Sequence, residues 1–246
     1  MKRLSLVLLV LVLATSLFYS CDQQEENGGT GVSVASPTSL QEYTGEIPES
    51  DTYIIDVLST IVQDVGSDID DLYDLYERYD GSAYTSQFSD TITGYYGGSC
   101  DVTGSGRWAD SDTATSASHS GSSDTSVTLN GYTSFYDAAV TGVSQGAERE
   151  NYSVNTTNGD YSLSGLYEFG FSVSMSGADC AGKYILFISA SGSQSGTVAN
   201  EYEFEEVLDS FSPTGTGYLK IYDNSDTLVR EITLTQSQMM SLYPNA

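Results

Sequence analysis

The sequence predicts a mainly β protein: an antiparallel meander sheet, forming a sandwich or a curved half-barrel, preceded by an amphipathic helix or helix pair. Three observations predict this class. Apolar and polar residues alternate over Tyr161–Met175, residues 51–81 have helical periodicity instead, and the remaining strand-like segments follow one another with short turns. Consecutive strands joined by short turns pair as an antiparallel meander.

The alternating stretch is the clearest strand signal. Its odd positions are mostly apolar and its even positions are mostly Ser, so we expect the odd side chains to face the core and the even ones to face away. The stretch exceeds the usual strand length of about six residues, so Gly165 or Gly170 is expected to mark a bend or bulge. The nearly unbroken apolar run Lys183–Ala190 predicts a central strand covered on both faces.

Weaker patterns predict further strands and one long loop. Residues 109–126 consist mainly of Ser, Thr, Asp, Ala and Gly, and we expect a long exposed loop or poor edge strands there. Asp223–Asp226 is typical of a hairpin turn near the C-terminus. The weaker strands are expected at Thr91–Tyr96, Cys100–Trp108, Val127–Phe135, Ala138–Ser144, Tyr152–Thr156, Val198–Phe204, Gly217–Tyr222 and Thr227–Leu234.

The helical segment comprises residues 51–81, with Ser50 or Asp51 as N-cap and Gly81 as C-cap. Gly66 in its interior costs about 1 kcal/mol, so two helices bent there are the alternative. We expect the apolar face to pack on the sheet; a lid over a ligand cavity is the other possibility. The apolar positions are Ile54, Leu58, Ile61, Val65, Ile69, Leu72, Tyr76 and Tyr79.

Composition limits the function classes. The 246 residues fit one domain, or a β-domain with a helical appendage. The chain has 34 Asp and Glu against 8 Lys and Arg, and nucleic-acid binding needs basic side chains to neutralise phosphates. We therefore expect no nucleic-acid partner. The 19 Tyr and 8 Phe supply apolar surface for burial, which argues against disorder.

The N-terminus has the pattern of an export signal. Lys2 and Arg3 precede the apolar run Leu4–Leu13, which is too short to span a bilayer needing about 20 helical residues. The run is followed by Ser20 and Cys21. This end resembles the lipobox of bacterial lipoproteins, in which the Cys becomes the first mature residue and carries the lipid.

The lipobox resemblance covers these 21 residues only, and Leu17, Phe18 and Tyr19 depart from the commoner Leu-Ala-Gly pattern. A plain signal peptide cut elsewhere is the alternative. The resemblance implies acyl chains on Cys21 and a bacterial envelope protein, periplasmic or surface-exposed. The Ser-Gly-rich strands, Gly-Ser-Cys at Cys100 and Leu129-Asn130-Gly131 are similar in texture to uncharacterised β-rich envelope lipoproteins, a likeness that implies no activity.

Four segments follow from these patterns: a signal peptide over 1–20, a flexible polar tether over 21–50, the helical segment over 51–81 and an antiparallel β-domain over 82–246. Without its signal the chain keeps six basic and 34 acidic residues, a formal charge of −28. Such a charge opposes docking of the domain on anionic lipid, so the acyl chains would have to hold the membrane alone.

The remaining cysteines form an even pair. In an exported chain Cys100 and Cys180 are predicted to form one disulfide, and two unpaired thiols are the alternative.

No pattern identifies catalytic chemistry. Gly142–Gly146 matches the G-x-S-x-G nucleophile elbow, but no helical segment follows it, and the single His, His119, precedes Ser144. We expect His119 to be a solvated loop residue and Trp108 to belong to the core or its rim. No Asp-rich segment fits the EF-hand calcium loop. The sequence therefore predicts no catalytic residue, metal site or cofactor.

Two functional hypotheses remain. The first is a lipid-anchored bacterial envelope lipoprotein with a non-enzymatic structural, adhesive or interaction role, whose protein or lipid partner the sequence does not identify. The alternative is a module that binds an apolar ligand such as a lipid in a cavity between the sheet and the helix. Tyr167, Phe169 and Phe171 would line that cavity, and a cavity filled by side chains would favour the first hypothesis.

Overall fold

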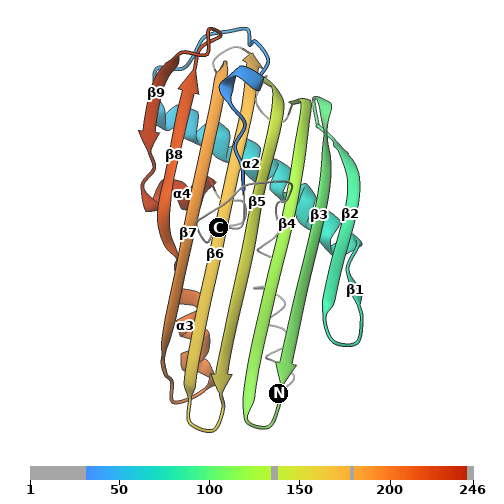
Figure 1. The fold of residues 1–246 in the computed structure, drawn as a ribbon, viewed down its shortest axis with the longest axis vertical. Coiled ribbons are helices and arrows are strands. Elements are labelled where there is room, and N and C mark those ends of the chain that lie inside the picture. The colour runs from blue at the N-terminus through green and yellow to red at the C-terminus, as the bar shows by residue number, and fades with distance from the viewer. Residues whose placement is uncertain (1–31, 134–137, 178–179, 243–246) are drawn as a thin grey trace.

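The computed structural model describes residues 32–133, 138–177 and 180–242. Within these ranges nine strands form one open antiparallel sheet whose spatial order, β1 to β9, is the order of the chain. Helices α2, α3 and α4 accompany the sheet, and in Figure 1 α2 crosses behind the long strands. The predicted class, a mainly β meander preceded by a helix, is confirmed.

The central strands are long and their pairing is mostly regular. β6 runs unbroken in register with β5 and β7, so neither Gly165 nor Gly170 marks the expected bulge. Register shifts occur instead at Gly97/Ser99, at Leu129/Tyr132 and at Ile221/Tyr222. The strands are β1 (Arg78–Tyr79), β2 (Tyr84–Thr93), β3 (Gly97–Asp112), β4 (Ser116–Thr133), β5 (Ala138–Asn155), β6 (Asp160–Gly177), β7 (Gly182–Thr197), β8 (Thr214–Tyr222) and β9 (Leu228–Thr233).

Residues 109–126, expected to form a long exposed loop or poor edge strands, belong to the β3–β4 hairpin in the interior of the sheet. Apart from the turn at residues 113–115, they are paired with neighbouring strands. Their Gly, Asp and Ala residues have low strand propensity, but β4 pairs with β3 on one side and β5 on the other. The neighbouring strands thus supply the stabilisation that the local sequence lacks. Similarly, the two short strands expected at 138–144 and 152–156 are parts of the single strand β5.

The predicted helical segment is one continuous helix, α2 (Asp51–Leu75). Ser50 is the N-cap, because its side chain accepts a hydrogen bond from the Tyr53 N–H. The helix ends before Gly81, which instead sits in the β1–β2 turn with a φ of +90°. The expected C-cap at Gly81 is therefore wrong, and Gly66 does not divide the helix.

The apolar face of α2 and one face of the sheet form the main core. Ile54, Leu58 and Ile69 of α2 are buried together with Phe169 and Phe171 of β6. The expectation that the odd residues of β6 face the core is confirmed at these two positions. We call this side of the sheet the helix face.

The opposite side of the sheet is covered in part by residues 32–45, which we call the strap (Figure 1). Ser33 N–H donates to Gln145 Oε1 at 3.1 Å, and Gly177 N–H donates to the Thr44 carbonyl at 3.0 Å. The flexible tether predicted over 21–50 is therefore wrong from residue 32 onward. Residues 1–31, with the predicted signal and Cys21, lie outside the described residues. We call this side of the sheet the strap face.

The strap changes the environment of the even residues of β6. Ser172 and Ser174 point to the strap face as expected, but both are buried. The hydroxyl of Ser172 donates to the Ala35 carbonyl at 3.3 Å. Nearer the start of β6, where the strap does not reach, Ser162 and Ser164 are exposed.

A second helix, α3 (Glu201–Ser210), replaces the strand predicted at Val198–Phe204. Asn200 caps it by accepting from the Glu203 N–H, and Glu203 reaches back to the Ala199 N–H. Phe204 packs with Leu163 and Val198 in a small second core on the helix face. The short helix α4 (Gln236–Leu242) closes the described chain and contacts α2.

Candidate functional site

The space between α2 and the sheet is filled by side chains. The cavity found there measures about 20 Å³, and its lining includes Val65, Phe169 and Phe171 but not Tyr167. A single water molecule needs about 10–15 Å³. A filled core is the observation that favours a structural or interaction role over an apolar-ligand module.

The predicted disulfide between Cys100 and Cys180 is not formed in the described chain. Cys100 lies in β3, whereas Cys180 lies between β6 and β7. Three strand spacings of about 4.8 Å separate β3 from β6, so Cys100 lies in a strand about 14 Å from the one that leads to Cys180. A disulfide needs a Cα separation below about 7 Å. Both residues are buried, and burial, followed by the charges of Asp68 and Asp101, raises the Cys100 pKa to about 12.

The G-x-S-x-G motif is not a nucleophile elbow. Gly142–Gly146 lies within β5 and pairs with β4 and β6 on its two sides. The Ser144 hydroxyl donates to the Gly170 carbonyl at 3.3 Å. A nucleophile elbow requires a sharp turn from a strand into a helix, so Ser144 has the role of an ordinary strand residue.

His119 is a buried strand residue, not the solvated loop histidine that the sequence predicts. It lies in β4 directly opposite Asp110 of β3 and Tyr152 of β5. Its Nδ1 is 2.8 Å from Asp110 Oδ1, and its Nε2 is 3.0 Å from Glu150 Oε1. The Tyr152 ring stacks on the imidazole at a centroid distance of 5.0 Å. The side chain of His119 is 1% exposed.

Gly121 makes this arrangement possible. It follows His119 by two residues on the same face of β4 and stands opposite Glu150. A Cβ at Gly121 would lie 2.8 Å from Glu150 Cγ and 2.9 Å from His119 Nε2. The missing side chain therefore leaves the room in which the carboxylate reaches the imidazole.

The two carboxylates determine the charge of His119. Burial alone would lower the pKa of the imidazole, but the hydrogen bonds to Asp110 and Glu150 and their negative charges outweigh it and raise the pKa to about 9. At neutral pH the imidazolium therefore donates from both nitrogens.

Because both ring nitrogens are engaged, His119 has none left to act as a general base or metal ligand. Across the described residues, no group of three or more His, Cys, Asp or Glu side chains is arranged to hold a metal ion. His119, Asp110 and Glu150, which we call the His119 cluster, thus join β3, β4 and β5 by charge-assisted hydrogen bonds on the helix face.

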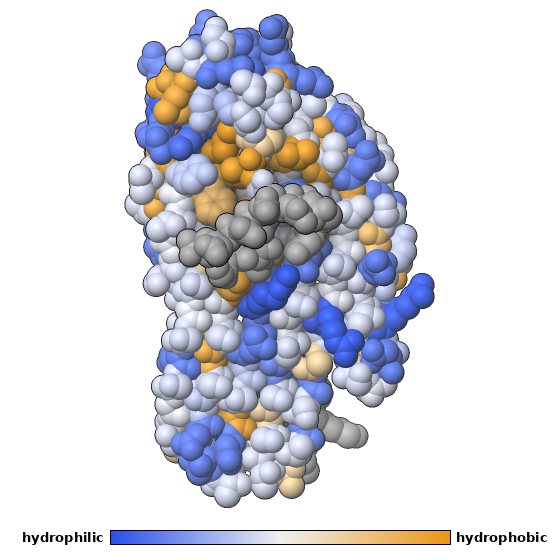
Figure 2. Space-filling view, in the orientation of Figure 1, coloured by the Kyte–Doolittle hydropathy of each residue, from blue (hydrophilic) through white to orange (hydrophobic). Residues whose placement is uncertain are grey.

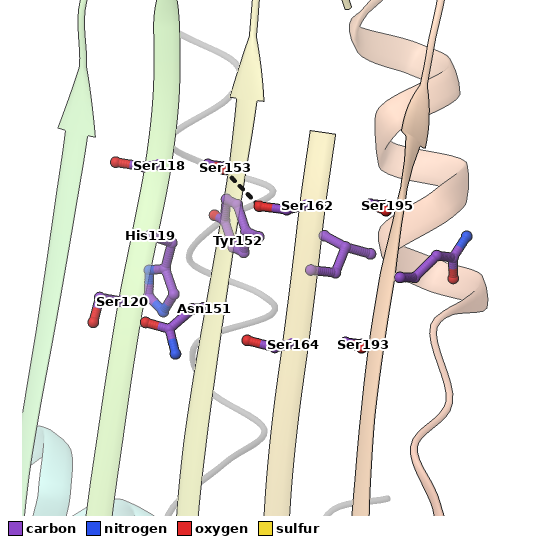
Figure 3. Close-up of a pocket in the computed structure, with 12 residues that line it drawn as sticks. Ser118, His119, Ser120, Asn151, Tyr152, Ser153, Ser162, Ser164, Ser193 and Ser195 are labelled. Carbon is purple, nitrogen blue, oxygen red and sulfur yellow. Dashed lines mark hydrogen bonds between the residues drawn. The ribbon is translucent and has the colours of Figure 1, made fainter. Parts of the chain in front are cut away.

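The strap face carries an open hollow of about 590 Å³. It lies where the strap does not cover β4, β5, β6 and β7, and two rows of short polar side chains border it (Figure 3). The backbone of residues such as His119 and Leu163 forms its floor, because their side chains point to the helix face. We call the two rows the hydroxyl face: Ser118, Ser153, Ser162 and Ser195, and Ser120, Asn151, Ser164 and Ser193.

The hydroxyl face is regular and uncharged. Its members stand in register across four strands, so neighbouring side chains are about 4.8 Å apart across the strands and about 7 Å apart along them. Hydroxyl and amide groups both donate and accept hydrogen bonds. Such a surface can bind a polar partner without ion pairing. In the sequence, the hydroxyl face could have been recognised from the Ser at every second position of residues 116–122. These residues lie in the segment whose composition suggested an exposed loop or poor edge strands.

No protein-family model, curated protein or solved structure matches the chain. Among the described residues, no helix combines the length and the apolar character needed to cross a membrane.

Proposed function

We propose that this chain is a lipid-anchored bacterial envelope lipoprotein with a non-enzymatic structural, adhesive or interaction role. The observation that carries the proposal is the hydroxyl face, two rows of uncharged polar side chains on a continuously paired sheet. The cavity found between α2 and the sheet, in contrast, measures only about 20 Å³. A rigid surface of hydrogen-bonding groups loses little conformational entropy on contact, which suits an interaction role.

The anchor in this proposal comes from the sequence. The basic start at Lys2 and Arg3, the apolar run and the Ser20-Cys21 end are typical of an exported and lipidated chain. Two acyl signals or more hold a protein stably on a membrane, whereas the strongly negative domain surface contributes little attraction to anionic lipid.

A non-enzymatic role is supported by the state of the chemical groups. The imidazole nitrogens of His119 are both held by carboxylates, and Ser144 lies in the middle of a paired strand. Within the described chain neither residue has the acid–base or nucleophile geometry that catalysis needs.

The anchor is tested by expressing the full chain in bacteria fed with labelled palmitate. We expect the wild-type protein to carry label and to sediment with membranes, and Cys21→Ser to lose both properties. Cys100→Ser is the matched control and should behave like the wild type. A Cys21→Ser protein that still sediments with membranes, beside an unlabelled wild type, would overturn the proposal.

A further inference from the structure

The strap fixes where the anchor segment leaves the domain. Its first residues lie on β6, where a Cβ at Gly170 would be 2.8 Å from Val34 Cγ1 and 3.0 Å from Val32 Cγ1. Ser33 is hydrogen-bonded to Gln145 of the neighbouring strand β5. The chain that leads back to Cys21 therefore leaves from the strap face.

The length of the segment between Cys21 and the strap limits which face of the domain can reach the membrane. Ten residues lie between Cys21 and Val32, so the eleven Cα–Cα steps from Cys21 to Val32 span at most about 40 Å at full extension. To bring the helix face to the membrane, the segment would have to pass three strands, about 14 Å, and then the sheet and helix layers, about 20 Å. That path needs nearly full extension, whereas the strap face can approach the membrane without it.

The charge distribution also favours an approach of the strap face to the membrane. The helices of the helix face contain many carboxylates and no Lys or Arg. Such a surface is repelled by anionic headgroups and is costly to dehydrate. The acidic residues are Asp51, Asp56, Asp64, Asp68, Asp70, Asp71 and Asp74 of α2, and Glu201, Glu203, Glu205, Glu206 and Asp209 of α3.

The part of the strap face that the strap leaves uncovered differs from the helices in charge. The hydroxyl face has no ionic side chain. In Figure 2 the lower part of this side is mostly pale, which marks residues of intermediate hydropathy. Beyond it, basic residues of the strap face pair with acidic ones: Arg149 with Asp124, and Lys183 with Asp226. The repulsion from anionic lipid is therefore weaker at the hydroxyl face than at the acidic helices.

We infer that the hydroxyl face lies against the headgroup layer of the membrane that holds the Cys21 acyl chains, with the acidic helix face turned away. The acyl chains supply the affinity, and the Ser and Asn side chains hydrogen-bond to headgroup phosphates and carbonyls. This inference rests on the lipid anchor proposed above, because without the anchor nothing holds the domain at a membrane.

The orientation is tested with the lipidated full chain in vesicles of phosphatidylcholine and phosphatidylglycerol. One protein carries a nitroxide label at Ser164→Cys on the hydroxyl face, and its matched control carries the label at Asp56→Cys on α2. Both positions are exposed, whereas Cys100 and Cys180 are buried and protected from the reagent. The measurement is the accessibility of each label to a water-soluble paramagnetic chelate, with and without vesicles.

We expect vesicles to lower the accessibility of the Ser164→Cys label severalfold and to leave the Asp56→Cys label unchanged. Equal protection of the two labels, or stronger protection at Asp56→Cys, would overturn the inference while leaving the anchor intact. Failure of the wild-type protein to float with vesicles would overturn the anchor itself, and the two failures are therefore distinguishable.

A second comparison uses charge. With the label at Ser193→Cys, the added substitution Ser162→Glu places a carboxylate on the hydroxyl face. We expect it to restore part of the chelate accessibility in anionic vesicles and to have no effect in high salt, because salt screens the repulsion. Unchanged accessibility at low salt would count against contact between this face and the lipid.

Discussion

Asp110 and His119 stand directly opposite each other on β3 and β4, and His119 Nδ1 lies 2.8 Å from Asp110 Oδ1. Glu150 holds the other ring nitrogen at 3.0 Å. A histidine bound on both sides by carboxylates is more stable when it is protonated. The sheet thus contains a group whose ionisation is coupled to folding.

The first prediction follows from this coupling. The pKa of His119 is raised from 6.5 to about 9 in the folded protein, so its stabilisation is complete below about pH 6.5 and is lost as the pH rises through about 9. The loss is at most about 3 kcal/mol. Urea denaturation of the wild type and of His119→Gln, at intervals from pH 6 to about pH 10, measures the difference. A difference that does not fall over this range would contradict the assignment.

The second prediction concerns the two faces of β6. Phe171→Ala should destabilise the protein by about 3–5 kcal/mol, because Phe171 is buried in the main core. Ser172→Ala should cost about 1 kcal/mol, because it removes the donor to the Ala35 carbonyl under the strap. Exposed Ser164→Ala should change stability by less than about 0.5 kcal/mol. If chemical denaturation finds Ser172→Ala as silent as Ser164→Ala, the strap does not cover this part of the sheet.

The third prediction concerns the close approach of the strap to the sheet. Gly45 has a φ of +119°, and a Cβ there would lie 2.5 Å from the Gly177 carbonyl oxygen. Gly81 is the matched control, since its φ is +90° but a Cβ there would have no atom within 4 Å. Both Ala variants bear a backbone strain of about 1–3 kcal/mol. Gly45→Ala should lose further stability and become more sensitive to proteolysis within the strap.

Limited proteolysis and urea denaturation of the two glycine variants make this comparison. The same loss of stability in Gly45→Ala and Gly81→Ala would show that steric contact with Gly177 has no effect. The strap would then be held by its other contacts with the sheet, such as the hydrogen bond from Ser33 to Gln145.

The fourth prediction concerns the start of α2. Ser50→Ala removes the acceptor for the Tyr53 N–H and should lower stability by about 1 kcal/mol. Ser50→Asp keeps an acceptor at the N-cap and adds a favourable interaction with the helix dipole, so it should preserve stability. Thermal unfolding compares the two variants, and identical melting temperatures for them would mean that the cap does not contribute.

The fifth prediction concerns the thiol of Cys100. Because burial and nearby carboxylates raise its pKa to about 12, an alkylating reagent should not modify it in the native protein at pH 8. In denaturant without reductant it should be modified, because no disulfide with Cys180 protects it. Mass spectrometry of the peptide that contains Cys100 gives the answer. Modification only after reduction would restore the disulfide hypothesis.

The sequence predicts a segment correctly where apolar and polar residues alternate clearly, and fails where apolar residues are missing. The alternation in Tyr161–Met175 correctly identifies the inward face of β6, because Phe169 and Phe171 must leave water. Residues 109–126 form interior strands, not the exposed loop or poor edge strands expected, and the error arises because their side chains carry no apolar signal. Their strand conformation depends on hydrogen bonds to neighbouring strands, which local sequence does not reveal.

Two further errors have physical causes. Val198, Tyr202 and Phe204 alternate as in a strand, but the capping pair Asn200 and Glu203 starts a helix there. This capping pair can be recognised in the sequence as the start of a helix. The packing of residues 32–45 and the contacts of His119 with Asp110 and Glu150 cannot be recognised from local sequence. Both depend on residues far apart in the chain: the Tyr43 N–H donates to Asn224, and Glu150 contacts His119.

The order of the sheet has a consequence for how the chain folds. Since every strand is followed in space by the next strand in sequence, each new pairing closes a short turn, apart from the β7–β8 connection that contains α3. Loop-closure entropy is then small at each step, and contacts of low sequence separation favour fast folding. The sheet can therefore grow one strand at a time from its N-terminal edge, and the irregular pairing of β9 at Ile221/Tyr222 makes the final edge a poor template for a further strand.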